Sequence, residues 1–329
     1  MERKEGFTSG AIQACRRLLG VRPTAIDTPG GSRRRSIRVV LNGQPAIVTR
    51  RRNANRAALE LAVLTALGAK GAPVPRVIAH GDGWLIQEDL GPQRLSAVVS
   101  GPDAVLWLDR AASSLARIHE AGRQVGLAAH VAPIGRAPEW LRENVLAAPA
   151  KVGRLAGIAP PAFDVVKLAK LLSAFAPSFI KWDARPGNAI ARADGCVGWF
   201  DWEHCGVRCT LDDLVWLFAD EYVDVPSTTE VAILERHLEK FGDTVEDPNR
   251  YLRVFGTFHI CVRLGLILAH RGDGAWWDPA LCLERDKVLV TQEAALRLCR
   301  RGADWAARVP ETMLLAPWFG QIGAALGTS

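Results

Sequence analysis

The chain has 329 residues, of which 49% are hydrophobic and 23% are charged, as is ordinary for a water-soluble globular protein of one large domain or two lobes. Its formal net charge is +6, and basic residues gather near the N-terminus at Arg33–Arg35 and Arg50–Arg52. This cluster has three readings, namely a nucleic-acid surface, a solvated face or a site for a phosphorylated ligand. Because no nucleic-acid-binding module is recognisable, we expect no nucleic-acid partner.

The first hundred residues predict a strand-rich region with one helix. Asn42-Gly43 lies between two apolar, β-branched runs and is the strongest short signal for a hairpin. Farther along, apolar residues recur at helical spacing and stop at Gly68. The expected elements are strands at residues 36–41, 45–49, 77–79 and 84–87 and a helix at residues 55–67.

Helical patterns dominate from residue 92 onward. A strong amphipathic helix is expected at residues 104–121 and another at residues 162–175. Residues 178–201 form a dense block of short strands and loops, and helices are expected from Leu211 to the end. Strands followed by helices indicate an α+β chain. We divide it into residues 1–91 and residues 92–329.

The cysteines and the apolar stretches argue against several classes of protein. The seven cysteines are an odd number in a large chain, so no disulfide framework is indicated. Cys196, Cys205 and Cys209 lie near His204, but no CxxC pair occurs among them, and buried thiols are favoured over zinc. The N-terminus is charged, and residues 254–268 are short and interrupted by charge. We therefore expect a cytoplasmic protein without a membrane span.

The block at residues 178–201 carries the residues with the clearest chemical meaning. Asp183 and Asn188 are separated by four residues, and a hairpin turning at Asp194-Gly195 leads on to Asp201. The hairpin brings Asn188 and Asp201 to neighbouring strand ends, where one amide oxygen and one carboxylate can share Mg²⁺. Asp183 can face the same site from the preceding loop without binding the metal.

Phosphoryl transfer needs this arrangement, because in that reaction the protein mainly positions groups and neutralises charge. Asp183 would accept the proton of the acceptor hydroxyl, while Asn188 and Asp201 would hold Mg²⁺ on the phosphates of ATP. Arg185 would hold the loop of the base or contact the transferred phosphoryl group. The alternative is a chance pattern, since Asp and Asn are common in turns. The second aspartate one hairpin later weakens that alternative.

Two segments resemble the aminoglycoside phosphotransferase family, which includes choline-kinase-like enzymes. They are Lys-Trp-Asp-Ala-Arg-Pro-Gly-Asn at residues 181–188 and Phe-Asp-Trp-Glu at residues 200–203. Residues 85–91 resemble the interlobe hinge of that family, and Asp213-Leu214 resembles a later helix start. The resemblance implies a bilobal protein-kinase-like fold with a small β-rich N-lobe and a larger helical C-lobe.

The resemblance also implies an ATP pocket. A glycine loop would cover the phosphates, and an arginine would replace the family's strand lysine, with Arg51 or Arg52 as alternatives to Arg50. An acidic residue on the next helix would be the ion-pair partner of that arginine. The backbone of the hinge would meet the edge of adenine. The residues implied are Gly30 and Gly31 for the loop, Arg50 and Glu60 for the ion pair, and Glu88 and Leu90 for the hinge.

The chain departs from the family pattern at three places. Lys181 stands where the family has a histidine, an arginine replaces the strand lysine, and residues 208–210 are Arg-Cys-Thr rather than Gly-Asp-Pro. We expect His119 to be a core residue, and Asp213 to cap a helix or brace the loop of the base. The departures motivate an alternative function, a divergent kinase-fold protein that binds nucleotide or a partner without efficient turnover.

The acceptor is expected to be a small-molecule alcohol bound by the C-terminal helices. An acidic cluster beside aromatic residues suits a cationic or sugar-like alcohol, such as an aminoglycoside, choline or an amino sugar. The alternative is a helix end with solvated carboxylates and packed tryptophans. The sequence determines neither the acceptor nor the oligomeric state. The candidate acceptor residues are Asp220, Glu221, Asp224, Trp276, Trp277 and Asp278.

Overall fold

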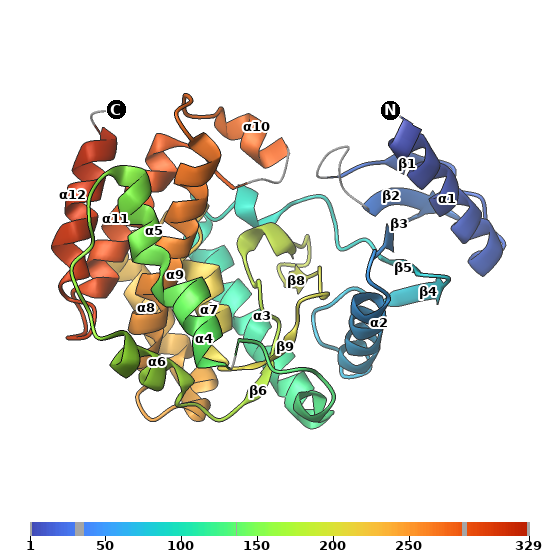
Figure 1. Cartoon of the computed structure of the whole chain (residues 1–329). Coiled ribbons are helices and arrows are strands. Elements are labelled where there is room, and N and C mark those ends of the chain that lie inside the picture. Colours follow the sequence, from blue (N-terminus) through green and yellow to red (C-terminus); the bar gives the residue numbers. More distant parts are fainter. Residues whose placement is uncertain (1, 30–35, 136, 285–287, 328–329) are drawn as a thin grey trace.

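The structure is a computed structural model that describes residues 2–29, 36–135, 137–284 and 288–327. A small lobe of strands and two helices lies beside a larger, mostly helical lobe (Figure 1). This confirms the predicted α+β class with a β-rich N-terminal part and a helical C-terminal part. The boundary between residues 91 and 92 stays a prediction.

The small lobe is built on an antiparallel sheet. Asn42 and Gly43 have φ values of 51° and 78°, the left-handed pair that a tight hairpin turn requires, so this hairpin forms where the sequence predicts it. Within the described residues the order of strands is β1-β2-β3-β5-β4. The strands are β1 (Ile26–Asp27), β2 (Ser36–Leu41), β3 (Gln44–Arg50), β4 (Val77–Gly81) and β5 (Trp84–Glu88).

The two faces of this sheet have different roles, because successive side chains along a strand point to opposite sides. One face packs its apolar residues, among them Val48 and Ile86, against helix α1 (Glu2–Leu19). Helix α1 lies on the side of the sheet away from the helical lobe (Figure 1). The other face, with Arg38 and Gln87, turns toward a cavity between the lobes.

Helix α1 was not expected, although the sequence carries a signal for it. Its residues Phe7, Ala11, Ala14 and Leu18 follow a helical spacing and pack on the sheet. Four charged residues at positions 2–5 and polar residues between the apolar positions mask this stripe in a simple reading. The predicted helix after β3 is confirmed as α2 (Ala54–Gly68). Asn53 caps its N-terminus, because the Asn53 side chain accepts hydrogen bonds from two backbone amides of the first turn.

The large lobe consists of helices with two short antiparallel strand pairs. The strand pairs are β6 (Ser178–Ile180) with β9 (Gly206–Arg208), and β7 (Ala189–Ala191) with β8 (Val197–Trp199). Within the described residues the α-helices of this lobe are α3 (Ala104–Gln124), α4 (Pro138–Leu141), α5 (Ala148–Ala156), α6 (Val165–Ser173), α7 (Leu211–Phe218), α8 (Ser227–Phe241), α9 (Pro248–Arg271), α10 (Pro279–Glu284), α11 (Gln292–Ala306) and α12 (Leu315–Gly327).

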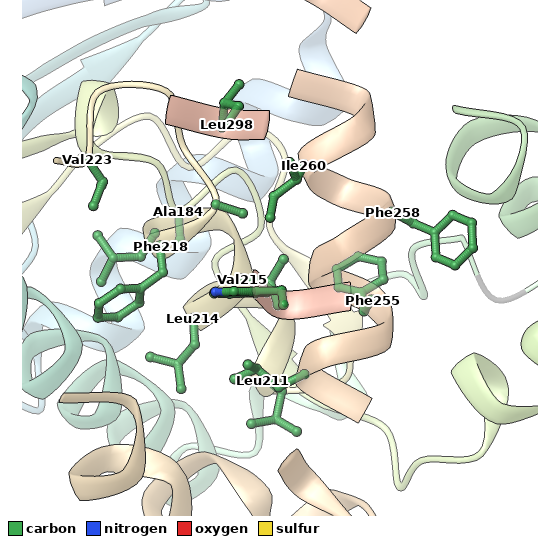
Figure 2. Packing of buried hydrophobic residues seen from close by; sticks show 14 of the residues in the cluster. Ala184, Leu211, Leu214, Val215, Phe218, Val223, Phe255, Phe258, Ile260 and Leu298 are labelled. Carbon is green, nitrogen blue, oxygen red and sulfur yellow. The ribbon is translucent and has the colours of Figure 1, made fainter. Parts of the chain in front are cut away.

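Helix α7 is embedded in the core of this lobe and supports the loops of the site. Figure 2 shows Val215 and Phe218 of α7 in one core with Phe255 of α9 and Leu298 of α11. Each of these side chains is at most 1% exposed. Burial of one such side chain contributes about 1.5–3 kcal/mol to the free energy of unfolding. The segments before and after α7 are therefore anchored to a rigid element.

Helix α9 is long and apolar enough, by length and composition, to cross a membrane. It runs for 24 residues, so the expectation that this stretch is too short to do so is wrong. However, 83% of its most apolar window is buried inside the protein, the position of a core helix. Arg263, one of the charged residues of this helix, is 4% exposed and donates a hydrogen bond to Glu221.

Candidate active site

The loop that follows β6 is braced by a buried aspartate. Asp213, in the first turn of α7, accepts hydrogen bonds from the backbone amides of Lys181 and Trp182, each at 2.8 Å. Its Oδ2 also accepts from Nε2 of His119 on α3 at 2.8 Å. Asp213 and His119 are at most 1% exposed. Asp213 therefore braces this loop, as expected, and His119 is a core residue that supports the brace.

The braced loop holds Asp183 in an unusual backbone conformation. Trp182 and Asp183 have φ values of 54° and 52°, and Asp201 has a φ value of 63°. Such left-handed conformations cost about 1–3 kcal/mol each in residues other than glycine and persist only when the surrounding structure imposes them. The hydrogen bonds to Asp213 impose two of them. The fixed backbone conformation thereby restricts the orientation of the Asp183 carboxylate.

Asn188 connects Asp183 to the neighbouring strand pair. Its Nδ2 donates to Oδ2 of Asp183 at 2.7 Å and to the Asp183 carbonyl at 3.0 Å. Its backbone carbonyl accepts from the amide of Phe200 at 3.1 Å, directly before Asp201. The structure thus brings Asp183, Asn188 and Asp201 together, and the amide oxygen of Asn188 is not used by the bonds to Asp183.

The carboxylate of Asp201 is paired with Arg51. Nη2 of Arg51 lies 2.7 Å from Oδ1 of Asp201, and the same guanidinium binds Glu60 at 2.7 Å and Glu203 at 2.8 Å. Burial, the largest effect, raises the pKa of Asp201, but the charges of Arg51 and Lys181 outweigh it and hold that pKa below its usual value. Asp201 is therefore ionised at neutral pH.

The expectation that Arg50 pairs with Glu60 is wrong, and the alternative with Arg51 is correct. The side chain of Arg50 is exposed and lies 5.4 Å from the ring centroid of Trp84. Both residues lie on the face of the sheet that points away from the cavity. Arg50 lies on the same face as Val48, because the two residues are separated by two positions along β3. Alternation along β3 favours Arg51 only once it is known that Val48 faces α1.

Replacing Arg51 with methionine should lower the free energy of unfolding by about 2–3 kcal/mol, because the carboxylate of Glu60 then stays buried without its cation. Glu60 is 1% exposed. Arg50→Met is the matched control and should change the free energy by less than about 0.5 kcal/mol. Urea unfolding at pH 7 measures both. Equal effects of the two substitutions would contradict the assignment.

Lys181 lies in the protein interior rather than in the site. It is 0% exposed, its Nζ donates to the Asp201 carbonyl at 3.3 Å, and it lies 5.3 Å from the ring centroid of Trp202. Burial, the largest effect, lowers the pKa of Lys181 despite the neighbouring carboxylates. Lys181 thus replaces the expected histidine as a support beneath the Asp201 backbone.

Arg185 tethers the loop of Asp183 to the segment after α7. Its Nε lies 3.2 Å from Asp220, and its Nη2 lies 3.2 Å from Glu221. Arg263 of α9 also binds Glu221, with Nε donating at 2.8 Å. Burial, the largest effect, raises the pKa of Glu221, but the charges of Arg263 and Arg185 outweigh it and lower that pKa to about 2.

These ion pairs change the interpretation of the acidic cluster. Asp220 and Glu221 are at most 1% exposed, and their charges are matched by Arg185 and Arg263. Asp224 is paired with Arg297 at 2.5 Å. Asp220 and Glu221 are therefore neither an unpaired acidic cluster for a cationic acceptor nor the solvated carboxylates of the alternative interpretation. Their burial depends on partner arginines that lie far from them in the sequence.

A cavity of about 180 Å³ lies between the sheet and the large lobe. Its lining includes the predicted residues Glu88, Leu90 and Asp201, together with Arg51. Arg50 and Glu60 are not part of this lining. Gly30 and Gly31 lie outside the described residues.

The donor set beside this cavity suits a hard divalent cation. The described residues contain no cluster of three or more His, Cys, Asp or Glu side chains that could hold a metal by themselves. Mg²⁺ commonly uses one or two protein oxygens, with phosphates and waters completing its octahedron. Asp201 and the amide oxygen of Asn188 supply such a pair, so the residues present fit Mg²⁺ bound together with a polyphosphate.

Residues 26–250 match the sequence model of one protein family, described as the phosphotransferase enzyme family (APH). The matched region exceeds half of the 329 residues and contains the braced loop and the Asp201 strand end. A search of curated proteins gives no significant match to this sequence.

Several solved structures share the fold. Choline kinase LicA from Streptococcus pneumoniae is 14% identical, with a TM-score of 0.53 over 92% of this chain and 100% of that chain. Amicoumacin kinase hAmiN, in complex with AMP-PNP, Ca²⁺ and Ami, is 14% identical, with a TM-score of 0.56 over 84% and 91% of the two chains. Spectinomycin phosphotransferase, in complex with ADP and spectinomycin, is 11% identical, with a TM-score of 0.52 over 98% of each chain. These similarities confirm the predicted bilobal fold.

Proposed function

The chain belongs to the phosphotransferase enzyme family, and from this we propose that it transfers the γ-phosphoryl group of ATP to a hydroxyl group of a small molecule. The observation that carries the proposal is the contact between Asp183 and Asn188 beside Asp201. Of these three residues Asp201 lines the cavity, and the grouping supports one proposed base and two proposed oxygen ligands for a cation. This grouping is what phosphoryl transfer requires of a protein.

Asp183 is the proposed catalytic base. Its carboxylate is held by Nδ2 of Asn188 and by the left-handed backbone of the braced loop. In this position it would accept the proton of the acceptor hydroxyl as that oxygen attacks the γ-phosphorus. Arg185 is proposed as a positioning residue, since its contacts with Asp220 and Glu221 fasten the same loop.

Asn188 and Asp201 are the proposed ligands of Mg²⁺. The cation, when bound, supplies positive charge that neutralises the phosphate oxygens. Arg51, in contact with Asp201, would add a second positive charge beside the phosphates, and Glu60 orients its guanidinium. Gly30 and Gly31 remain proposed as the loop over the phosphates, and Glu88 and Leu90 as the backbone that meets adenine.

Two further aspects of the function are proposals. Complexes of amicoumacin kinase with AMP-PNP and of spectinomycin phosphotransferase with ADP support ATP as the donor. Among the acceptor classes, we favour a sugar-like alcohol over a polycation such as an aminoglycoside or over choline. The reason is that Asp220 and Glu221 are already neutralised by Arg185 and Arg263. An ATP-dependent reaction also fits a cytoplasmic protein.

The alternative without efficient turnover rests on the three departures from the family pattern, of which Lys181 lies nearest to the proposed base in the chain. Its side chain is buried away from the site, while its backbone amide still donates to Asp213. The substitution therefore leaves the conformation of the loop intact, and we favour an active enzyme.

The proposal is tested by incubating the protein with magnesium-ATP and a panel of sugar alcohols, amino sugars and choline. We expect ADP release with at least one acceptor and a phosphorylated product in the mass spectrum. Calorimetry should show that magnesium strengthens ATP binding to the wild type but not to Asp201→Asn. Absence of ATP binding would refute the proposal. Binding without transfer to any acceptor would favour the alternative.

A further inference from the structure

Arg94 follows the strands of the small lobe in the chain and lines the cavity between the lobes. Its backbone is held against strand β7 of the large lobe. Arg94 pairs with Ile190 in antiparallel orientation. Beside it, the Gln93 carbonyl accepts a hydrogen bond from the Ala191 amide at 2.9 Å. The side chain of Arg94 therefore starts from a fixed point relative to β7.

The Arg94 side chain contacts the residue before each proposed magnesium ligand. Its Nη1 donates a hydrogen bond to the carbonyl of Gly187, which directly precedes Asn188. The same guanidinium lies 4.6 Å from the ring centroid of Phe200, which directly precedes Asp201. At this distance a cation is attracted to the face of an aromatic ring. One side chain thus reaches both backbone segments that carry the proposed ligands.

The two segments are also bonded to each other and to the loop of the proposed base. The Asn188 carbonyl accepts from the Phe200 amide at 3.1 Å, and the Asn188 amide donates to the Arg185 carbonyl at 2.9 Å. The peptide group before Asn188 is thus held on both sides, at its carbonyl by Arg94 and at its amide by Arg185. A group that orients a metal ligand affects metal binding without touching the metal, and its loss typically costs about 10- to 100-fold in affinity.

We propose that Arg94 positions the magnesium ligands Asn188 and Asp201, an inference that rests on the proposed function. Its contacts with Gly187 and Phe200 fix the distance between the two ligand oxygens that share the cation. Arg94 is in this account a positioning residue, which acts on the metal through the backbone segments that it holds.

A direct contact of the Arg94 guanidinium with the phosphates of ATP is the alternative, because this side chain lines the cavity. The two roles differ in their dependence on magnesium. A phosphate contact strengthens ATP binding at least as much without magnesium, since free ATP carries more negative charge than its magnesium complex. A residue that positions the metal ligands strengthens ATP binding only through the cation.

The test measures the dissociation constant of ATP by calorimetry in magnesium and in EDTA, so it requires neither an acceptor nor transfer. The magnesium effect is the ratio of the EDTA value to the magnesium value. Arg94→Met removes the hydrogen bond to Gly187 and the cation beside Phe200, and it should lower the magnesium effect about tenfold or more. Its binding of ATP in EDTA shows that the variant is folded. Phe200→Leu removes no charge and should lower the magnesium effect about threefold or more.

Arg271→Met is the matched control, because Arg271 makes the same two kinds of contact outside the lining of the cavity. Its Nε donates to the Gly274 carbonyl at 3.2 Å, and its guanidinium lies 4.2 Å from the ring centroid of Trp276. This variant should leave the magnesium effect unchanged. A loss of ATP binding by Arg94→Met that is as large in EDTA, or an unchanged magnesium effect in Arg94→Met or Phe200→Leu, would overturn this inference alone. A wild type whose ATP binding is not strengthened by magnesium would overturn the proposed metal ligands as well, and one that binds no ATP would overturn the proposed function.

Discussion

Replacing Asp183 with asparagine should lower kcat by about 10²- to 10⁴-fold, the range that positioned general bases contribute. The asparagine oxygen can still accept the hydrogen bond that Nδ2 of Asn188 donates to Oδ2 of Asp183. The shape of the loop is therefore retained, and the ability to accept a proton is lost. The dissociation constant of magnesium-ATP should change by less than about twofold, because an interaction made only in the transition state affects kcat rather than binding.

The measurement is single-turnover transfer to the best acceptor of the panel, together with calorimetry of magnesium-ATP. Asp194→Asn is the matched control, because Asp194 is an exposed aspartate on the hairpin between β7 and β8. It should leave kcat unchanged. A kcat for Asp183→Asn within about threefold of the wild type would exclude Asp183 as the general base. A parallel loss of nucleotide binding would instead indicate that Asp183 contributes to the nucleotide site.

The second large effect concerns the buried ion pair of Arg208 with Asp212, both 0% exposed. Nε of Arg208 donates to Asp212, and Nη1 donates to the Gly135 carbonyl at 3.1 Å. The Arg208 guanidinium also lies 5.2 to 5.8 Å from aromatic ring centroids. These rings belong to Trp140, Phe175, Trp182 and Phe255.

Arg208→Met should lower the free energy of unfolding by about 3–5 kcal/mol, because it leaves the Asp212 carboxylate buried without its cation. The pair of Arg192 with Asp194, whose side chains are 30% and 53% exposed, provides the control. Arg192→Met should cost less than about 1 kcal/mol. Urea unfolding measures both, and equal slopes of the unfolding curves would show that the unfolded states are comparable. A loss of less than about 1 kcal/mol in Arg208→Met would contradict this account.

The pH dependence of Arg208→Met follows from the same pair. Burial, the largest effect, raises the pKa of Asp212 from its ordinary value of 3.8 to about 6, and Arg208 opposes this increase. Without Arg208 the folded-state pKa rises further. Between the unfolded and the folded pKa the native state binds more protons, so stability falls as the pH rises. The deficit of the variant should therefore be smaller at pH 5 than at pH 8.

The departures from the family pattern at residues 208–210 thus have roles in packing. Arg208 forms the ion pair with Asp212 in the first turn of α7, and Oγ1 of Thr210 donates to the carbonyl of Phe241. The same helix carries Asp213, which braces the loop of Asp183. These substitutions stabilise the element that supports the site, and they leave intact the contact of Asp183 with Asn188 beside the Asp201 strand end.

Local patterns in the sequence were sufficient for much of the fold and for the central residues of the site. The hairpin at Asn42-Gly43 and the helix beginning at residue 104 formed as predicted, because turn conformation and helical periodicity depend on neighbours in the chain. The strand pair at residues 189–199 likewise brought Asn188 next to the Asp201 strand end. The catalytic and metal-binding roles of these residues stay predictions.

Only the tertiary structure decided which groups are available for chemistry. Arg51 rather than Arg50 reaches Glu60, because the packing of one sheet face on α1 determines which side of β3 faces the cavity. Asp220 and Glu221 are neutralised by arginines from distant segments. The sequence by itself determined the local conformations and the residue types of the site. Burial and ion pairing depend on contacts between remote segments, so they required the folded chain.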